Sequence, residues 1–254
     1  MLGVIDKDLL KVRFARGVGT YSEAASVQAE MADRLLAMVT AGGRREFPSV
    51  LEIGPGDGTL TGRLERCLRF ERLTLLELVP EWKVFHCRRP RAEFIVGDAE
   101  KFDFTGCEYD LIVANAVFQW FTDPDSALAR LECALAPGGV IAFSTFVPGN
   151  LREIFELTGR GLPTRSAAGC REIVDRHFRT LDVEEYVRTL GFPDPLAALR
   201  HLKRTGVTGV APAPRWNRRT LETFCREYLR RFGRSDGSVT LTYRPLLVIA
   251  GKKE

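Results

Sequence analysis

The sequence predicts an α/β fold with a mostly parallel sheet, and three observations support this. Between residues 50 and 145, short apolar segments with strand character alternate with segments of helical periodicity, as in a parallel sheet covered by helices. The first strand runs directly into a glycine-rich turn at residues 54–58, which opens a helical pattern. The composition, 45% hydrophobic and 28% charged over 254 residues, is enough for one substantial core.

Two helices are expected before the first strand, at residues 6–16 and 22–39. In the second, Ser22 is a candidate N-cap and apolar residues recur at helical spacing. Asp123 and Pro124 mark the start of a later helix, as an N-cap and a first-turn proline. Strands are expected at residues 50–53, 72–78, 92–96, 110–114 and 140–145, with helices at 59–68 and 123–135.

The alternation loosens after residue 146. A strand is expected near residues 181–187, a surface helix at 218–232 and a long final strand at 238–250. We expect residues 1–254 to form a single domain. Within it, residues 1–45 form N-terminal helices that cover the site, and residues 146–205 form an insertion or lid above it.

Cysteine, histidine and apolar patterns exclude several classes of protein. The six cysteines contain no Cys-x-x-Cys pair and the three histidines are dispersed, so no metal-site spacing is present. Free thiols in a reducing cytoplasm are therefore expected. No apolar run approaches the length of a membrane span, and the N-terminus lacks the apolar region of a signal peptide. We expect a cytoplasmic protein that uses neither a metal nor a membrane.

Positive charge is concentrated in the C-terminal part of the chain. Residues 1–150 carry 17 Lys and Arg against 21 Asp and Glu, a net of −4. Residues 151–254 carry 20 against 12, a net of +8. This excess indicates either an acidic partner or a solvated basic face, and charge alone does not separate the two.

Residues 49–58, Ser-Val-Leu-Glu-Ile-Gly-Pro-Gly-Asp-Gly, carry the clearest binding signal. A strand, a tight glycine turn and a helix N-terminus let a ligand approach bare backbone, where N–H groups and the helix dipole favour negative charge. The spacing is Gly54-x-Gly56-x-Gly58, with Glu52 two residues earlier, and not the Gly-x-Gly-x-x-Gly of dinucleotide-binding folds. A glycine-rich turn without a ligand is the alternative.

Polar side chains follow the next three strands. Glu77 lies near the end of the second strand, where an α/β nucleotide-binding fold holds a ribose by its hydroxyls. Asp98 follows the third strand and Asn115 the fourth. Each feature is weak alone, since an Asp after a strand is usually a helix cap. Together with the glycine turn, and in this order, they favour cofactor binding.

The glycine turn resembles motif I of the class I S-adenosylmethionine-dependent methyltransferases. The resemblance implies a Rossmann-like sheet of seven mostly parallel strands with an antiparallel C-terminal strand, and a helical lid. It also implies S-adenosylmethionine as the cofactor and S-adenosylhomocysteine as its product. In such enzymes an Asp at the place of Asp98 accepts the adenine amino group, and the next residue supplies backbone contacts. The implied cofactor-binding residues are Glu52, Gly54, Gly56, Gly58, Glu77, Asp98, Ala99 and Asn115.

Nearly the full length resembles the malonyl-acyl-carrier-protein O-methyltransferases of biotin synthesis. The matching elements are Phe14-(x)6-Tyr21-(x)3-Ala25-(x)2-Gln28, Asn115-Ala116-Val117-Phe118-Gln119-Trp120, residues 142–146, residues 199–206 and Leu241-Thr242-Tyr243-Arg244. The first element is shared with several small-molecule and quinone methyltransferases. The Gln-Trp pair, the Leu-Lys-x-x-Gly element and the Leu-Thr-Tyr strand are more specific. Thr208 departs from the family pattern.

The resemblance implies transfer of the sulfonium methyl group to the free carboxylate of a malonyl thioester. This carboxylate is ionised at neutral pH and nucleophilic, so no general base is required. In-line positioning, worth up to roughly 7–11 kcal/mol, and exclusion of water would lower the barrier. The candidate catalytic residues are Tyr21, Gln119 and Trp120. The alternatives are a packed core aromatic for the first and ordinary loop packing for the other two.

A substrate carboxylate also favours a cation, and an acidic carrier protein favours a basic docking surface. The candidates for substrate or carrier binding are Arg152, Arg200, Lys203 and Arg204. Malonyl-coenzyme A is an alternative to the malonyl-acyl-carrier protein. A nucleic-acid substrate is disfavoured, because no Asn-Pro-Pro-Tyr-like element of base methyltransferases follows the fourth strand.

Two further readings stay open. One is a class I methyltransferase that acts on another small acid or on a quinone precursor. The other is a non-catalytic cofactor-binding protein, which would more often have lost the glycines or the ribose-binding acid. Both of those features are intact here.

Overall fold

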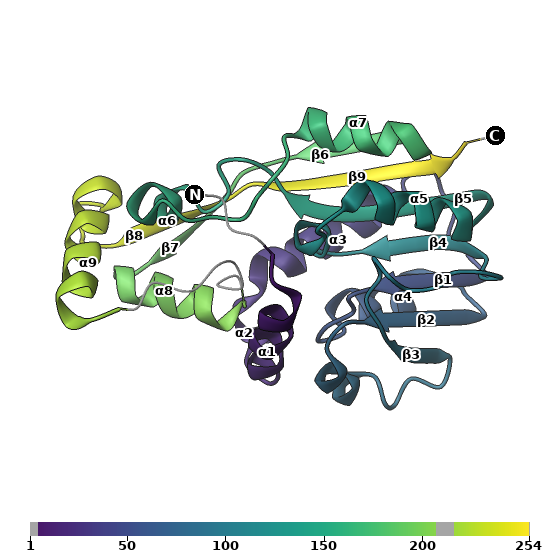
Figure 1. Cartoon of the computed structure of the whole chain (residues 1–254), viewed down its shortest axis with the longest axis horizontal. Coiled ribbons are helices and arrows are strands. Elements are labelled where there is room, and N and C mark those ends of the chain that lie inside the picture. Colours follow the sequence, from purple (N-terminus) through teal and green to yellow (C-terminus); the bar gives the residue numbers. More distant parts are fainter. Residues whose placement is uncertain (1–4, 207–215, 254) are drawn as a thin grey trace.

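The main sheet of the molecule has seven strands in the order β3-β2-β1-β4-β5-β9-β6 (Figure 1). The computed structural model describes residues 5–206 and 216–253, so Thr208 lies outside the described residues. The strands are β1 (Ser49–Ile53), β2 (Arg72–Glu77), β3 (Ala92–Val96), β4 (Tyr109–Ala114), β5 (Leu135–Phe146), β6 (Phe178–Glu185) and β9 (Pro245–Lys252). Strands β1 to β5 pair in parallel, and β9 runs antiparallel between β5 and β6. The predicted fold class is confirmed.

Helices cover both faces of this sheet because the central strands are apolar on both sides. Val50 points toward α3 (Ser26–Thr40) and α4 (Thr59–Cys67), in a core cluster with their leucines. Leu51, the next residue, packs on the other face with α5 (Pro124–Ala134) and α7 (Ala167–His177). Both side chains are fully buried. Consecutive apolar residues of this kind are typical of parallel strands that are covered on both faces.

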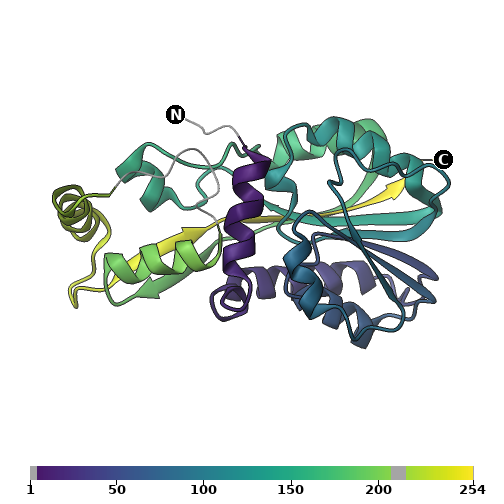
Figure 2. The same cartoon turned by 60° about the horizontal axis from the view of Figure 1, so that its bottom comes forward.

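The N-terminal region forms three helices and not two. They are α1 (Lys7–Gly17), α2 (Tyr21–Ala24) and α3. The expected helix over residues 22–39 is interrupted at Ala25, whose φ of −84° and ψ of 36° are not helical. Ser22 therefore lies inside α2 and is not an N-cap. Figure 2 shows α1 standing between the main sheet and a second, outer part of the molecule.

This outer module is a small sheet with three helices around it. Its strands β7 (Arg188–Phe192) and β8 (Val239–Tyr243) pair antiparallel. Its helices are α6 (Arg152–Thr158), α8 (Pro195–Arg204) and α9 (Arg218–Phe232). A separate core cluster holds these elements together, with Ala198, Phe224, Tyr228 and Val239 all buried. Residues 146–205 thus contribute α6, β7 and α8 to the outer module, and α7 and β6 to the main sheet.

The C-terminal strand passes from one sheet into the other, and the expectation of a single strand over residues 238–250 was wrong. Strands β8 and β9 belong to different sheets and are separated by Arg244. The N–H group of Arg244 donates to Asn150 Oδ1 at 3.2 Å, and its carbonyl accepts from Val147 N at 3.0 Å. The chain therefore changes partners here, immediately before Pro245. Figure 1 shows β8 and β9 following one another as a continuous arm between the two parts.

None of the helices within residues 5–206 and 216–253 is long and apolar enough to cross a membrane. In the same ranges, no group of three or more His, Cys, Asp or Glu side chains could hold a metal ion.

Candidate active site

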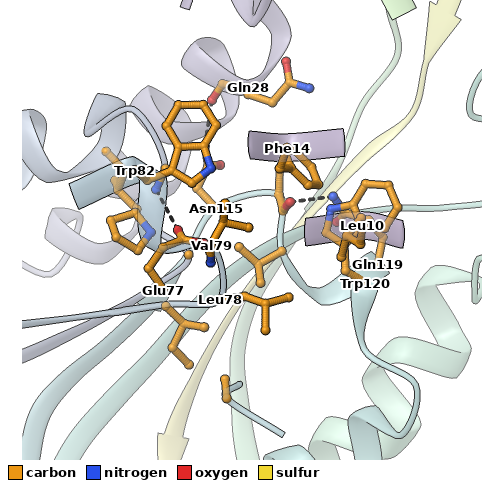
Figure 3. Close-up of a pocket in the computed structure, with 18 of the residues that line it drawn as sticks. Leu10, Phe14, Gln28, Glu77, Leu78, Val79, Trp82, Asn115, Gln119 and Trp120 are labelled. Carbon is orange, nitrogen blue, oxygen red and sulfur yellow. Dashed lines mark hydrogen bonds between the residues drawn. The ribbon is translucent and has the colours of Figure 1, made fainter. Parts of the chain in front are cut away.

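A cavity that is partly open to solvent lies at the carboxyl ends of β1, β2 and β4. This is the edge at which open α/β sheets bind ligands. Its walls come from the glycine turn, from the loops after β2, β3 and β4, from α1 and α2, and from the outer module. Figure 3 shows Glu77 and Trp82 on one side of the cavity, and Phe14, Gln119 and Trp120 on the other.

The three glycines of the turn share a positive φ but differ in what surrounds them. All have positive φ, +66° at Gly54, +51° at Gly56 and +79° at Gly58, which side chains rarely adopt. A Cβ atom at Gly54 would lie 2.5 Å from Val117 Cγ2, whereas a Cβ atom at Gly56 would meet nothing within 4 Å. Gly56 lines the cavity. The open space beside it is therefore space that a ligand can occupy. Gly58 does not line the cavity and precedes α4 at its N-cap.

Glu77 is held in place by the backbone around it. Its Oε2 accepts from Gly56 N at 3.1 Å and its Oε1 accepts from Val79 N at 2.9 Å. Burial raises the pKa of Glu77 to about 7. Each carboxylate oxygen can accept a second hydrogen bond, so the side chain keeps acceptor capacity for two hydroxyl groups. The position fits the ribose-binding role that the sequence suggested.

Glu52 has an unsatisfied oxygen beside the same cavity. The residue is 1% exposed, and its Oε2 has no hydrogen-bond partner within the described residues. Burial raises the pKa of Glu52 to about 8. A buried acceptor of this kind is costly unless a donor or a cation reaches it. S-adenosylmethionine carries both an ammonium and a sulfonium group, so the residues present fit this cofactor.

Asp98 and Ala99 line the cavity from the loop after β3, but Asp98 already has a partner that the sequence did not indicate. Lys7 Nζ, from α1, lies 2.5 Å from Asp98 Oδ1 and also pairs with Glu100. These ion pairs join residues 91 and 93 positions apart and hold α1 against the main sheet. Asn115 lines the cavity as well, with Nδ2 donating to the backbone carbonyl of Gln28 at 2.9 Å.

Aromatic side chains line the same cavity as these polar groups. Phe14 and Trp120 meet edge to face with ring centroids 5.6 Å apart, and Tyr21 and Trp82 do so at 5.7 Å. Burial raises the pKa of the Tyr21 hydroxyl, which therefore keeps its proton at neutral pH. Gln119 is 7% exposed and donates through Nε2 to the carbonyl of Ala116. The three candidate catalytic residues thus line one cavity.

Several lining residues were not among the candidates chosen from the sequence. Phe14 belonged to a quoted motif, and that motif was the available signal for it. Trp82 lies in the short helix η1 (Pro80–Phe85), directly after the strand that ends at Glu77, but no spacing rule singles it out. The residues missed include Lys7, Leu10, Phe14, Trp82, Thr205 and Tyr243.

The four candidate cations do not line the cavity. Arg152 Nε lies 3.7 Å from Glu153, and Arg200 Nη2 lies 3.9 Å from Asp194. Arg204 Nη2 lies 2.6 Å from Glu23. Lys203 is exposed and has no ion pair within the described ranges. In those ranges Lys7 is the cation that lines the cavity, and it is already paired with two carboxylates.

Comparison with known proteins identifies the family to which this chain is similar. Residues 51–143 match the family model described as "Methyltransferase domain". A malonyl-[acyl-carrier protein] O-methyltransferase from Bacteroides thetaiotaomicron is 36% identical over 98% of this chain and 100% of its own length. The protein of the same name from Chlorobium phaeovibrioides is 38% identical over 100% of both chains.

The chain belongs to the malonyl-[acyl-carrier protein] O-methyltransferase family. It is therefore a methyltransferase, and the resemblance found in the sequence motifs is confirmed. The match to family members runs through α1, the main sheet and the outer module alike, because it covers nearly the whole chain.

Solved structures support the fold at lower identity. A putative methyltransferase from Bacillus halodurans superposes with a TM-score of 0.64 at 14% identity, covering 88% of this chain and 99% of its own. The N-methyltransferase NodS from Bradyrhizobium japonicum, in complex with S-adenosylhomocysteine, gives 0.54 at 18% identity over 89% and 87%. These likenesses show the Rossmann-like class I methyltransferase fold.

Proposed function

We propose that this protein transfers the methyl group of S-adenosylmethionine to the free carboxylate of a malonyl-acyl-carrier protein. The product is the malonyl methyl ester that starts pimeloyl and biotin synthesis, together with S-adenosylhomocysteine. The observation that carries the proposal is the cavity itself. In a chain of this family, it combines an open glycine turn with aromatic side chains and with a buried carboxyl, one oxygen of which has no partner among the described residues.

The polar half of the cavity would hold the cofactor. We assign the ribose hydroxyls to Glu77, the ammonium group to Glu52 and the adenine amino group to Asp98. The backbone at Gly54 and Gly56 allows the close approach that these contacts need. The cofactor supplies an electrophilic methyl group on a positively charged sulfur. The residues of this chain have to bind it, orient it and exclude water.

The aromatic half of the cavity suits a substrate carboxylate that has to stay nucleophilic. Methyl transfer joins an anionic carboxylate to a cationic sulfonium group, so both charges disappear along the reaction. A strong ion pair to the carboxylate would stabilise the reactants more than the transition state. Neutral donors on an apolar wall, such as Tyr21 and Gln119, orient the carboxylate with a smaller penalty. The distance of the four candidate cations from the cavity is consistent with this mechanism.

The carrier protein is proposed as the natural form of the substrate, with malonyl-coenzyme A as the alternative. Residues 151–254 have a net charge of +8, and α8 displays Arg200 and Lys203 on the surface of the outer module. Carrier proteins are acidic, and complementary charge speeds their encounter with a basic surface. We also propose a cytoplasmic location without a nucleic-acid or membrane partner, which the six free cysteines support.

The test is an assay with radiolabelled S-adenosylmethionine and four acceptors. Malonyl-carrier protein, malonyl-coenzyme A and free malonate present the same carboxylate in different settings. Acetyl-carrier protein is the matched control, because it docks in the same way but lacks the free carboxylate. We expect label in the first two, with higher kcat/KM for the carrier protein, and none in the control. Label in acetyl-carrier protein, or in none of the four, would contradict the proposal.

A further inference from the structure

The outer module presents three polar side chains to the cavity, namely Asn150, Thr205 and Tyr243. Asn150 uses its Oδ1 to accept the N–H group of Arg244, and the Thr205 hydroxyl donates to backbone carbonyls at the end of α8. Tyr243 differs from both, because its hydroxyl meets two side chains, those of Thr205 and His201. His201 Nε2 lies 2.8 Å from the Tyr243 oxygen.

Tyr243 is fixed in its orientation. It is 1% exposed. Its ring centroid lies 6.0 Å from that of Phe146 and 6.1 Å from that of His201, which it meets edge to face. Burial raises the pKa of Tyr243, with the neighbouring Tyr21 and Tyr228 adding to the shift. The hydroxyl therefore keeps its proton at neutral pH. It is a rigid, neutral donor at the cavity wall, in the same cavity as Tyr21.

His201 determines what the Tyr243 proton can do. Burial lowers the pKa of His201, and the charge of Arg204 lowers it further, so the imidazole is neutral at neutral pH. The neutral imidazole can carry its proton on Nε2, and in this tautomer Nε2 donates to the Tyr243 oxygen. The phenolic proton is then available to an acceptor in the cavity. Phe192, with its ring centroid 5.0 Å from that of His201, packs against the imidazole.

We propose that the Tyr243 hydroxyl donates a hydrogen bond to the substrate carboxylate, and that His201 is the positioning residue that orients this hydroxyl. The inference rests on the proposed function and names a carboxylate-binding group for it. It also explains how a cavity without a free cation within the described residues recognises an anionic acceptor. A neutral donor binds the carboxylate while leaving it nucleophilic.

The first test removes the hydroxyl alone. Tyr243→Phe should lower kcat/KM for malonyl-carrier protein by about ten- to a hundredfold, the range for a hydrogen bond to a charged group. The affinity for S-adenosylhomocysteine, measured by calorimetric titration, should stay within about twofold and shows that the variant is folded. Tyr228→Phe is the matched control, because its hydroxyl donates to the carbonyl of Thr240 and does not line the cavity. We expect the control to keep the wild-type kcat/KM.

The second test separates positioning from a structural role. His201→Leu should lower kcat/KM, whereas His201→Gln, whose amide can still donate to the Tyr243 oxygen, should recover much of the activity. In the Tyr243→Phe background, His201→Leu should cause no further loss, because the hydroxyl on which His201 acts is gone. Should Tyr243→Phe fail to fold, the contrast between the two His201 variants decides the question.

Three results would overturn the inference. They are full kcat/KM in Tyr243→Phe, equal activity of His201→Leu and His201→Gln, or additive losses in the double variant. Failure of the proposed function is distinguishable from all three. In that case the wild-type protein itself would methylate neither malonyl-carrier protein nor malonyl-coenzyme A.

Discussion

Glu52 and Glu77 lie in the same cavity but have different hydrogen-bond environments. Both oxygens of Glu77 accept backbone N–H groups, whereas Glu52 keeps one oxygen without a partner among the described residues. Their positions in the sequence, two residues before the glycine turn and at the end of the second strand, predicted that both would line a cofactor site. The unpaired oxygen of Glu52 could not be predicted, because it depends on how residues far apart in the sequence pack together.

Binding of S-adenosylmethionine should release protons from Glu52. Burial raises the pKa of Glu52 to about 8, so the free protein carries it mostly protonated at pH 7. A cation in the cavity favours the carboxylate, lowers its pKa and expels the proton, so affinity should rise between about pH 6 and pH 8. Calorimetric titrations in two buffers of different ionisation enthalpy measure the release. Glu52→Gln should reduce it, and identical heats in both buffers for the wild type would contradict the assignment.

The raised pKa of Glu52 should also make the stability of the cofactor-free protein depend on pH. The folded pKa of about 8 exceeds the ordinary value of 4.5, so between these values the folded protein binds more protons than the unfolded chain. The cofactor-free protein should therefore lose stability as the pH rises through this window. Chemical denaturation at several pH values would show a shallower slope for Glu52→Gln.

Gly56→Ala should weaken cofactor binding by about tenfold or more, equivalent to about 1.4 kcal/mol. Its Cβ would project into open space of the cavity, where only a ligand would meet it. Gly138→Ala is the control, since Gly138 has φ of +71°, nothing within 4 Å of the added Cβ, and no place in the cavity wall. Both variants should lose similar stability from the strained backbone. Calorimetric titration with S-adenosylhomocysteine should separate them, and equal affinities would show that the turn does not contact the ligand.

At the scale of elements, the parallel strands of the main sheet were the most predictable part of the chain. Residues 92–96, the edge strand β3, were placed without error, because a short run of strand character between turns has few other interpretations. The break between α2 and α3 was missed, since helical periodicity continues across Ala25. The division of the last strand at Arg244 was also missed, although Pro245 was a usable signal, because proline cannot donate to a strand ladder.

Within the outer module, a buried acid on α6 joins this helix to strand β8. Glu153, on α6, is 0% exposed and accepts from both the N–H group and the hydroxyl of Thr242, at 3.0 and 2.6 Å. Glu153→Ala should lower the free energy of unfolding by about 1–3 kcal/mol, because it leaves a buried donor unpaired. Glu156→Ala, on the same helix but partly exposed and paired with Arg231, should change it by less than about 0.5 kcal/mol. Equal effects in thermal or chemical denaturation would show that the Glu153 contact contributes nothing of its own.

At the scale of the whole molecule, the cavity lies where the main sheet, α1 and the outer module meet. The sequence indicated the sheet edge, because motif spacing is local. The contacts that close the cavity are not local: Lys7 meets Asp98, and Tyr243 meets His201. Such pairs depend on the final packing of elements, which explains why Lys7, His201 and Tyr243 were missing from the candidates although Asp98 was among them.

Reversing the surface charge of α8 tests the docking of a carrier protein. Arg200→Glu with Lys203→Glu should raise KM for malonyl-carrier protein several-fold and leave malonyl-coenzyme A nearly unchanged. Added salt should reduce the difference, since the Debye length is only about 8 Å at physiological ionic strength. Arg45→Glu with Arg91→Glu is the control, because these exposed residues precede β1 and β3 at the opposite edge of the sheet. Equal losses in both double variants would place carrier docking elsewhere.

The attachment of α1 should affect how fast a molecule leaves the cavity as well as how tightly it binds. Lys7 bonds α1 to Asp98 and Glu100, while Leu10 and Phe14 of the same helix form part of the cavity wall. A molecule that leaves past α1 must therefore wait until the Lys7 ammonium separates from both carboxylates. That separation is a kinetic barrier, and it is independent of how well the molecule itself is bound. We therefore expect Lys7, although it lies outside the reacting centre, to lengthen the residence time of a molecule enclosed in the cavity.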